Sequence, residues 1–446
     1  MSPFGRSNKC DEIKVEVESL ISTLQRGLGN ARLSMPPSYC IFKTPSILFR
    51  HRENAFLPNC FSIGPMHHGK PNFVVTDKIK MKYLKGLLSR VLAATHPEAE
   101  KMSEEAKGIE EQKILSDWIN VVRSIEKQAM VCYAGLDCAE MGDEFVNMLL
   151  LDGCFIIELF RKDAEVVNKE LDDPIFSMSC MFQFLHHDLI LLENQIPWLV
   201  LQTLFDKTKL PSETKSLIEL ALHFFATMFT SNPPLKPDIF KDKDIKHILD
   251  FLRLSLILPS REIHLDKKSG WQPIRSLTKL KEAGVKFIKV APESILDIKF
   301  RNTGVLEIPS LLIQETTETI LRNLIAYEQC LPNCPPIFIS YAKVLDNLID
   351  TTSDLDILCK RDIWDNWLSP EDATQFFNKL YNDTYVKEFY YSNLYDDLNN
   401  YCKRWWPRWR AYYVQNYFSK PWAIAAQIYA VIMFVFTLWQ TYIKKG

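Results

Sequence analysis

The sequence predicts a mainly α-helical fold: a large, soluble helical domain with a small β-hairpin insert, followed by one C-terminal transmembrane helix. Three observations predict it. Glycine supplies only 14 of 446 residues, and a shortage of residues for tight turns favours long helices over many short strands. Apolar residues recur at steps of three and four along most of the chain, which is the spacing of a helix with one buried face. A single uncharged run occupies residues 421–443.

The helical spacing appears in six stretches: 75–91, 118–129, 145–160, 189–205, 316–327 and 363–380. Pro197 should kink the helix over 189–205 or divide it into two packed pieces. Between the first two stretches, residues 98–108 are expected to form a charged loop.

Two further segments break the helical pattern. Apolar and charged residues alternate over 296–300, and Asn302-Thr303-Gly304 separates them from a second run over 305–309, which predicts the β-hairpin. Three prolines and several charges make 231–244 the best internal linker. The expected organisation is an amino-terminal segment (1–35), the helical domain (36–400), a basic and aromatic segment (401–420) and the transmembrane helix (421–443).

The composition excludes several classes of protein. Lysine and arginine total 53 against 55 acidic residues, so no global field favours nucleic acid. The 11 cysteines are scattered and odd in number, which is typical of small buried residues in a reducing compartment. Charges over residues 11–18 exclude a secretory signal there.

The run 421–443 would extend about 35 Å as a helix, enough for a hydrocarbon core of about 30 Å. Aromatic rings near both ends match the preference of such rings for the membrane interfaces. The residues expected to anchor the helix are Trp422, Trp439, Tyr442, Lys420 and Lys444. A buried core helix or an interfacial helix is the alternative.

Basic residues before this run outnumber those after it. Lys403, Arg404, Arg408 and Arg410 precede it without an acidic residue among them, so the positive-inside rule places the body in the cytosol. An anchor at the very end of the chain predicts insertion after synthesis. The tryptophans interleaved over 403–410 could indicate nucleic acid, but the neighbouring helix favours lipid headgroups.

No motif with a known mechanism is present. The sequence contains no phosphate-binding loop, no GxSxG, no HExxH and no kinase signature. Gly27-Leu28-Gly29 lacks the third glycine of a dinucleotide loop and is interpreted as an ordinary loop. No cofactor is therefore expected.

Histidines and carboxylates are the remaining candidates. The pairs His67-His68 and His186-His187 could bind a metal, but adjacent helical residues diverge by about 100°, so loop or buried hydrogen-bonding roles are favoured. Asp152 and Glu158 lie in an apolar run, where paired carboxylates can serve as acid and base. Six residues apart on a helix, they should face different sides. Glu193-Asn194-Gln195 is interpreted as a capping or core hydrogen-bonding cluster.

Several ordered blocks resemble the plant family called domain of unknown function 247. They are 62–69 (SIGPMHHG), 151–159 (LDGCFIIEL), 191–197 (LLENQIP), 280–287 (LKEAGVKF), 306–309 (LEIP), 322–330 (RNLIAYEQC) and the terminal YF…PW. The resemblance covers roughly residues 36 to 443 and leaves 1–35 as a variable segment. Met66 departs from the tyrosine usual in this family.

The resemblance implies a membrane-anchored plant protein without established catalytic residues, and some grass members of this family are linked to self-incompatibility. Its candidate motif residues are Gly64, Pro65, His67, His68, Gly69, Asp152, Glu193, Asn194, Gln195 and Glu328. We expect a non-enzymatic interaction or signalling protein that contacts membrane lipid and a protein partner but not nucleic acid. The alternative is a membrane-bound enzyme such as a lipid hydrolase, using His67, His68 or the carboxylates of Asp152, Glu158 and Glu193.

Overall fold

A computed structural model describes most of the chain. The described residues are 17–26, 36–50, 52–226, 228, 235–260, 272–291, 294–386, 388–404, 407, 409 and 421–443. The chain divides into two compact units, Met1–Tyr39 and Cys40–Gly446. In the first unit, residues 17–26 form a helix.

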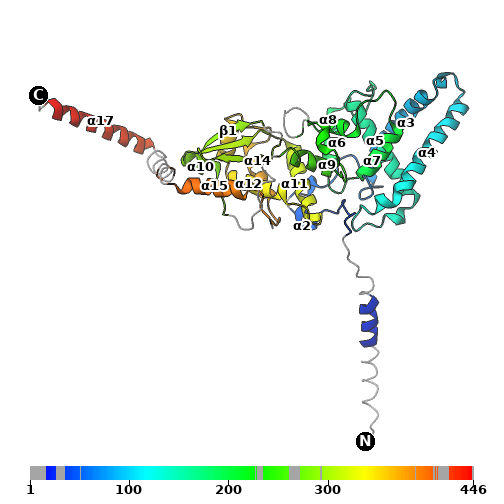
Figure 1. Ribbon diagram of the computed structural model, residues 1–446, viewed down its shortest axis with the longest axis horizontal. Coiled ribbons are helices and arrows are strands. Elements are labelled where there is room, and N and C mark those ends of the chain that lie inside the picture. Colours follow the sequence, from blue (N-terminus) through cyan, green and yellow to red (C-terminus); the bar gives the residue numbers. More distant parts are fainter. Residues whose placement is uncertain are drawn as a thin grey trace, which may run out of the picture. The chain divides into compact units, whose positions relative to one another are not determined.

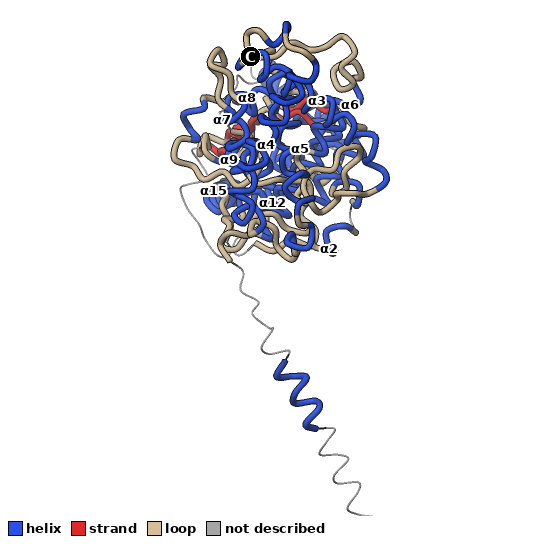
Figure 2. The backbone as a smooth tube through the Cα atoms, turned by 90° about the vertical axis from the view of Figure 1, so that its right-hand side faces the viewer, coloured by secondary structure: helices blue, strands red, loops and turns tan. Residues whose placement is uncertain are grey.

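The second unit is mainly helical with two small sheets (Figures 1 and 2). Its α-helices are α2 (Ser46–Phe49), α3 (Val74–Thr95), α4 (Glu104–Met130), α5 (Asp143–Asp163), α6 (Ser179–Asp188), α7 (Trp198–Thr208), α8 (Leu217–Phe225), α9 (Ile248–Ile257), α10 (Leu277–Glu282), α11 (Glu315–Cys330), α12 (Ile337–Leu348), α13 (Thr352–Cys359), α14 (Pro370–Leu380), α15 (Ser392–Lys403) and α17 (Pro421–Ile443). Its 3-10 helices are η1 (Glu53–Ala55), η2 (Pro71–Phe73), η3 (Ala99–Lys101), η4 (Cys138–Met141) and η5 (Pro237–Phe240). Its strands are β1 (Lys286–Val290), β2 (Lys299–Arg301), β3 (Val305–Pro309), β4 (Leu311–Ile313) and β5 (Trp364–Asn366).

Helix α5 is the centre of the first group of helices. It packs against α3, α4, α7 and α8, and nearly every residue from Phe145 to Lys162 is buried. Acidic residues in its first turn and basic residues in its last turn complement the helix dipole. At Gly153 an added Cβ would lie 2.5 Å from a methyl carbon of Leu204, so this glycine permits the close approach of α5 and α7.

The predicted hairpin is confirmed, and it belongs to a larger sheet. Strands β2 and β3 pair antiparallel across the turn at Gly304, while β1 pairs parallel with the other edge of β3. Strand β4 pairs parallel with β5. Helix α11 contacts α6 and α9 as well as α12 and α14, so it joins the first group of helices to the part that contains the sheets.

Three sequence expectations about local structure are wrong. Helix α4 begins at Glu104, inside the expected charged loop, because Ser103 caps its first turn by accepting a hydrogen bond from Ala106 N–H. Residues 189–197 form no helix, and α7 begins only after Pro197. Residues 364–366 form strand β5, and α14 begins at Pro370.

Helix α17 forms at the residues predicted for the membrane span. Its large apolar side chains described from Ile428 to Phe436 are 46–66% exposed, and Trp439 is 60% exposed. Among the described residues, no helix combines the length and apolar character needed to cross a membrane, so the predicted transmembrane helix is not supported. The side chains of Trp422 and Tyr442, together with Lys420 and Lys444, lie outside what the structure describes.

Candidate functional site

Residues 59–64, which run into the first motif block (62–69), belong to no helix or strand, yet distant side chains bind their backbone. Asp188 accepts hydrogen bonds from the amides of Asn59, Cys60 and Phe61 at 2.7–2.8 Å. Asn194 accepts from Ile63 N–H at 2.7 Å and donates to Phe61 C=O at 2.8 Å. Buried backbone N–H and C=O groups need hydrogen-bond partners. In this segment side chains provide those partners, in place of the backbone of a neighbouring strand. Asp152, Asp188, Asn194 and Lys80 are called the polar cluster below.

Gly64 ends this segment in a conformation that favours glycine. Its φ is +75°, and its N–H donates to Asp152 Oδ2 at 2.8 Å. An added Cβ would lie 2.3 Å from the carbonyl oxygen of Gln195. The first and third motif blocks therefore touch at a distance that only glycine allows.

Asp152 and Lys80 form a buried ion pair. Lys80 Nζ lies 2.7 Å from Asp152 Oδ1, and both side chains are 2% exposed. Lys80 also donates to Ser62 C=O and lies 3.1 Å from Asp77. Burial alone lowers the pKa of Lys80, but the carboxylates of Asp152 and Asp77 outweigh burial and raise that pKa. The lysine is thus held charged between α3 and α5.

His67 and Glu193 form a second buried contact. His67 Nε2 lies 3.3 Å from Glu193 Oε2, and Lys70 Nζ donates to His67 Nδ1 at 2.6 Å, which places the ring proton on Nε2. Thr44 N–H donates to Glu193 Oε1 at 2.8 Å. Burial raises the pKa of Glu193, but the nearby His67 ring and the hydrogen bond from Thr44 N–H outweigh burial and lower it. These contacts hold residue 44 against the motif blocks.

The other histidines point to separate partners. His68 contacts the exposed Glu144 at 3.1 Å. His186 contacts Phe224 C=O and lies among phenylalanine rings, and this burial lowers its pKa to about 4. His187 contacts Asp188 and Asn59. Over the described part of the chain, no group of three or more histidine, cysteine or acidic side chains is arranged to hold a metal ion.

Glu328 lies buried beside the start of α12. Its Oε2 accepts hydrogen bonds from the amides of Phe338 and Ile339 at 2.9 and 3.1 Å, and Arg253 lies 3.4 Å away. Complete burial raises the pKa of Glu328 to about 7, although Arg253 and these amides oppose the rise. The carboxyl group therefore titrates near neutral pH.

This raised pKa predicts a pH-dependent stability. Between pH 4.5 and about 7 the folded protein keeps a proton on Glu328 that the unfolded chain releases, so stability should fall as pH rises through this window. The contribution is at most about 3 kcal/mol. In urea unfolding at several pH values, Glu328→Gln should remove that part of the slope. Glu371→Gln, on the exposed first turn of α14, should keep it, and equal slopes for the two variants would contradict the prediction.

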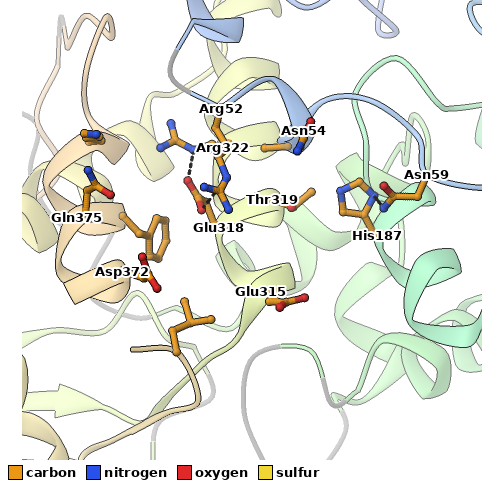
Figure 3. A pocket seen from close by; sticks show the side chains of 14 residues that line it. Arg52, Asn54, Asn59, His187, Glu315, Glu318, Thr319, Arg322, Asp372 and Gln375 are labelled. Atoms are coloured by element: carbon orange, nitrogen blue, oxygen red, sulfur yellow. Dashed lines mark hydrogen bonds and ion pairs between the residues drawn. The ribbon is translucent and has the colours of Figure 1, made fainter. Parts of the chain in front are cut away.

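A polar pocket of about 470 Å³ lies between η1, the end of α6, α11 and α14 (Figure 3). Its charged side chains are of both signs: Arg52, Arg322, Lys379, Glu315, Glu318 and Asp372. Arg322 and Arg52 lie 2.8 and 3.6 Å from Glu318, and His187 and Asn59 line the wall nearest the polar cluster. Such a pocket suits a ligand or peptide segment that carries charges of both signs.

The structure brings most of the motif residues together. Gly64, His67, Asp152, Glu193, Asn194 and Gln195 meet around residues 59–64. Four motif residues lie outside this group. Glu328 lies beside α12, and His68 points to Glu144. Pro65 is half-buried, and Gly69 has a φ of +73° with open space around it. Asp152 and Glu158, considered above as an acid and base pair, do not act together, because Glu158 forms an ion pair with Arg90 and Asp152 forms one with Lys80.

Sequence reasoning missed Lys80, Asn323 and His247 as members of the buried polar network. Lys80 follows the helical spacing of the apolar face of α3, and that position was the available signal. Asn323 joins Leu192 N–H to Ala55 C=O. His247 contacts Cys40 C=O at 2.9 Å, and burial lowers its pKa to about 3.

The fold and the buried polar contacts place the chain in a general class of mainly helical proteins. In it, side chains from separate motif blocks hydrogen-bond to the backbone of irregular segments and hold them in place. The chain belongs to the family DUF247, described as plant protein of unknown function, whose model matches residues 41–436. It is 27% identical over 435 residues to the UPF0481 protein At3g47200 of Arabidopsis thaliana, covering 91% of this chain and 86% of that one. A second Arabidopsis thaliana relative, the UPF0481 protein At3g02645, is 21% identical over 498 residues, covering 88% of each chain. No solved structure matches this chain.

Proposed function

We propose that this protein is a membrane-attached interaction protein without catalytic activity, which binds a partner through the polar pocket between α11 and α14. The charges in that pocket carry the proposal. Lys379 and Glu315 are exposed, while Arg322 and Glu318 are paired behind them. A partner segment with both an acidic and a basic group would complement the pocket, which favours specificity and fast association.

The contacts of the motif residues also support a role without catalysis. Asp152, Glu158 and Glu193 are paired with Lys80, Arg90 and His67 respectively. None of these residues lines the polar pocket. A lipid hydrolase would need a nucleophile or acid and base aimed at a shared cleft, and these side chains instead contact different elements of the fold.

Attachment through residues 421–443 is the second part of the proposal. Its support is the uncharged sequence of α17 and the exposure of its apolar side chains from Ile428 to Phe436, which would favour transfer to a lipid environment. Full-length protein should stay in the membrane pellet after alkaline carbonate extraction, and a chain ending at residue 420 should be released. Release of both would contradict attachment by this segment.

Charge reversal in the pocket tests the partner site. Proximity labelling from an amino-terminal tag in plant tissue should recover a reproducible set of proteins. Lys379→Glu should reduce labelling of direct partners at least about tenfold, because the new carboxylate would repel the acidic group of the partner that Lys379 attracts. Lys85→Glu, on the exposed side of α3, is the matched control and should label as the unmodified protein does. Identical profiles for both variants would exclude the pocket as the binding site.

A further inference from the structure

Two cysteines from distant parts of the chain lie side by side where the second unit begins. Ile41 pairs with Tyr133 in a parallel bridge, and the amides of Cys40 and Ile41 both donate to Cys132 C=O, at 2.9 and 3.0 Å. Cys40 and Cys132 each come one residue before this bridge, so they lie opposite each other on the two paired backbones. Paired backbones place such residues about 5 Å apart between Cα atoms, within the range that a disulfide spans.

The surroundings of the two thiols differ. Cys40 is 2% exposed, whereas Cys132 is half-buried at the end of α4. The neighbouring Cys40 thiol, together with the charge of Lys246, outweighs burial and lowers the pKa of Cys132. The neighbouring Cys132 thiol, and then burial, raises the pKa of Cys40. Asp244 and the carbonyl of Gln128, at 3.4 Å from Cys132 Sγ, oppose the thiolate.

We propose that Cys40 and Cys132 form an oxidisable dithiol, a modification site in which Cys132 reacts first and Cys40 then closes a disulfide. The Cys132 thiolate attacks one oxygen of a peroxide, the O–O bond breaks, and the departing oxygen takes a proton to leave as water or an alcohol. This leaves a sulfenic acid on Cys132. Cys40 then loses its proton and attacks that sulfur, and the hydroxyl group leaves with the proton as water. The two sulfurs together lose two electrons to the peroxide.

The geometry favours this pairing over the other cysteines near Cys132. Burial raises the pKa of Cys138, and Cys132 is close enough to raise it further. However, Cys138 lies in η4 and is 2% exposed, and no backbone pairing holds it opposite Cys132. The ten cysteines in the described residues are all free, so the dithiol is present in reduced form. Its oxidation would join residue 40 covalently to the end of α4.

The test treats reduced, full-length protein in detergent with a small excess of hydrogen peroxide. Remaining thiols are alkylated, and unreduced tryptic peptides are identified by mass spectrometry. The expected product is a peptide pair linked through Cys40 and Cys132, formed at least about tenfold faster than oxidation of the exposed Cys180, because thiolate character governs the rate. Thioredoxin or dithiothreitol should reverse it.

Variants separate the two steps. Cys40→Ser should leave a sulfenic acid on Cys132 that dimedone traps, and Cys132→Ser should abolish both products. Cys180→Ser is the control and should form the Cys40–Cys132 link as the unmodified protein does. Two results with the unmodified protein would overturn the proposal: a disulfide formed mainly between Cys132 and Cys138, or oxidation of Cys132 no faster than that of Cys180.

Discussion

Replacing Asp152 by alanine is expected to lower the free energy of unfolding by about 3–5 kcal/mol, the range for removing one partner of a buried ion pair. The substitution leaves the ammonium group of Lys80, whose side chain is 2% exposed, without its closest counter-charge. It also leaves the amide of Gly64 without its acceptor. Urea unfolding followed by circular dichroism measures the loss.

Two comparisons make this result specific. Asp356→Ala removes an exposed ion pair with Lys360 and should change stability by less than about 0.5 kcal/mol. The double variant Lys80→Met, Asp152→Leu removes both buried charges and should recover much of the loss, because the carboxylate that loses Lys80, that of Asp77, is 36% exposed to solvent. If the double variant were as unstable as Asp152→Ala, the ion pair would not be the cause.

The second large effect is expected at Gly64. Gly64→Ala places a Cβ 2.3 Å from the Gln195 carbonyl oxygen at a φ of +75°, so both steric overlap and backbone strain oppose folding. Strain of this kind accounts for roughly 1–2 kcal/mol, and displacement of the buried segment should add at least about 2 kcal/mol more. The midpoint of thermal unfolding should therefore fall sharply.

Substitutions at two other glycines separate the effect of backbone strain from the effect of steric overlap with Gln195. Gly69 has a similar φ of +73° but no atom within 4 Å of an added Cβ, so Gly69→Ala should show the strain alone. Gly86 lies within α3 with open space around it, and Gly86→Ala should stabilise the protein by roughly 0.5–1 kcal/mol. Equal losses at Gly64 and Gly69 would mean that the contact with Gln195 is unimportant.

The sequence predicted those elements whose signal is local. Helices α3, α5 and α11 follow from apolar spacing within one segment, and the β2–β3 hairpin follows from alternation on either side of a turn. Strands β1 and β5 were missed because their partners, β3 and β4, lie elsewhere in the chain. Local pattern does not encode such parallel pairings.

Residues 189–197 show the opposite error, because apolar spacing there predicted a helix that does not form. Gln195 donates to the carbonyls of Leu189 and Leu191, and Asn194 donates to Asp188 C=O, so side chains replace the helical hydrogen bonds. The interpretation of Asn194 and Gln195 as a core hydrogen-bonding cluster anticipated these contacts. Their partners in residues 59–64 could not be predicted, since no spacing rule relates segments about 130 residues apart.

Residues 59–64 depend on side chains from α3, α5, α6 and the segment after α6. This dependence limits where the chain can be truncated. A fragment that starts after residue 64 would keep the acceptors of Asp152, Asp188 and Asn194 but lose the amides that occupy them. Those acceptors would then be desolvated without compensation. Expression of a well-folded body therefore requires a start site upstream of residue 59, so that the early chain can complete the interior assembled by later residues.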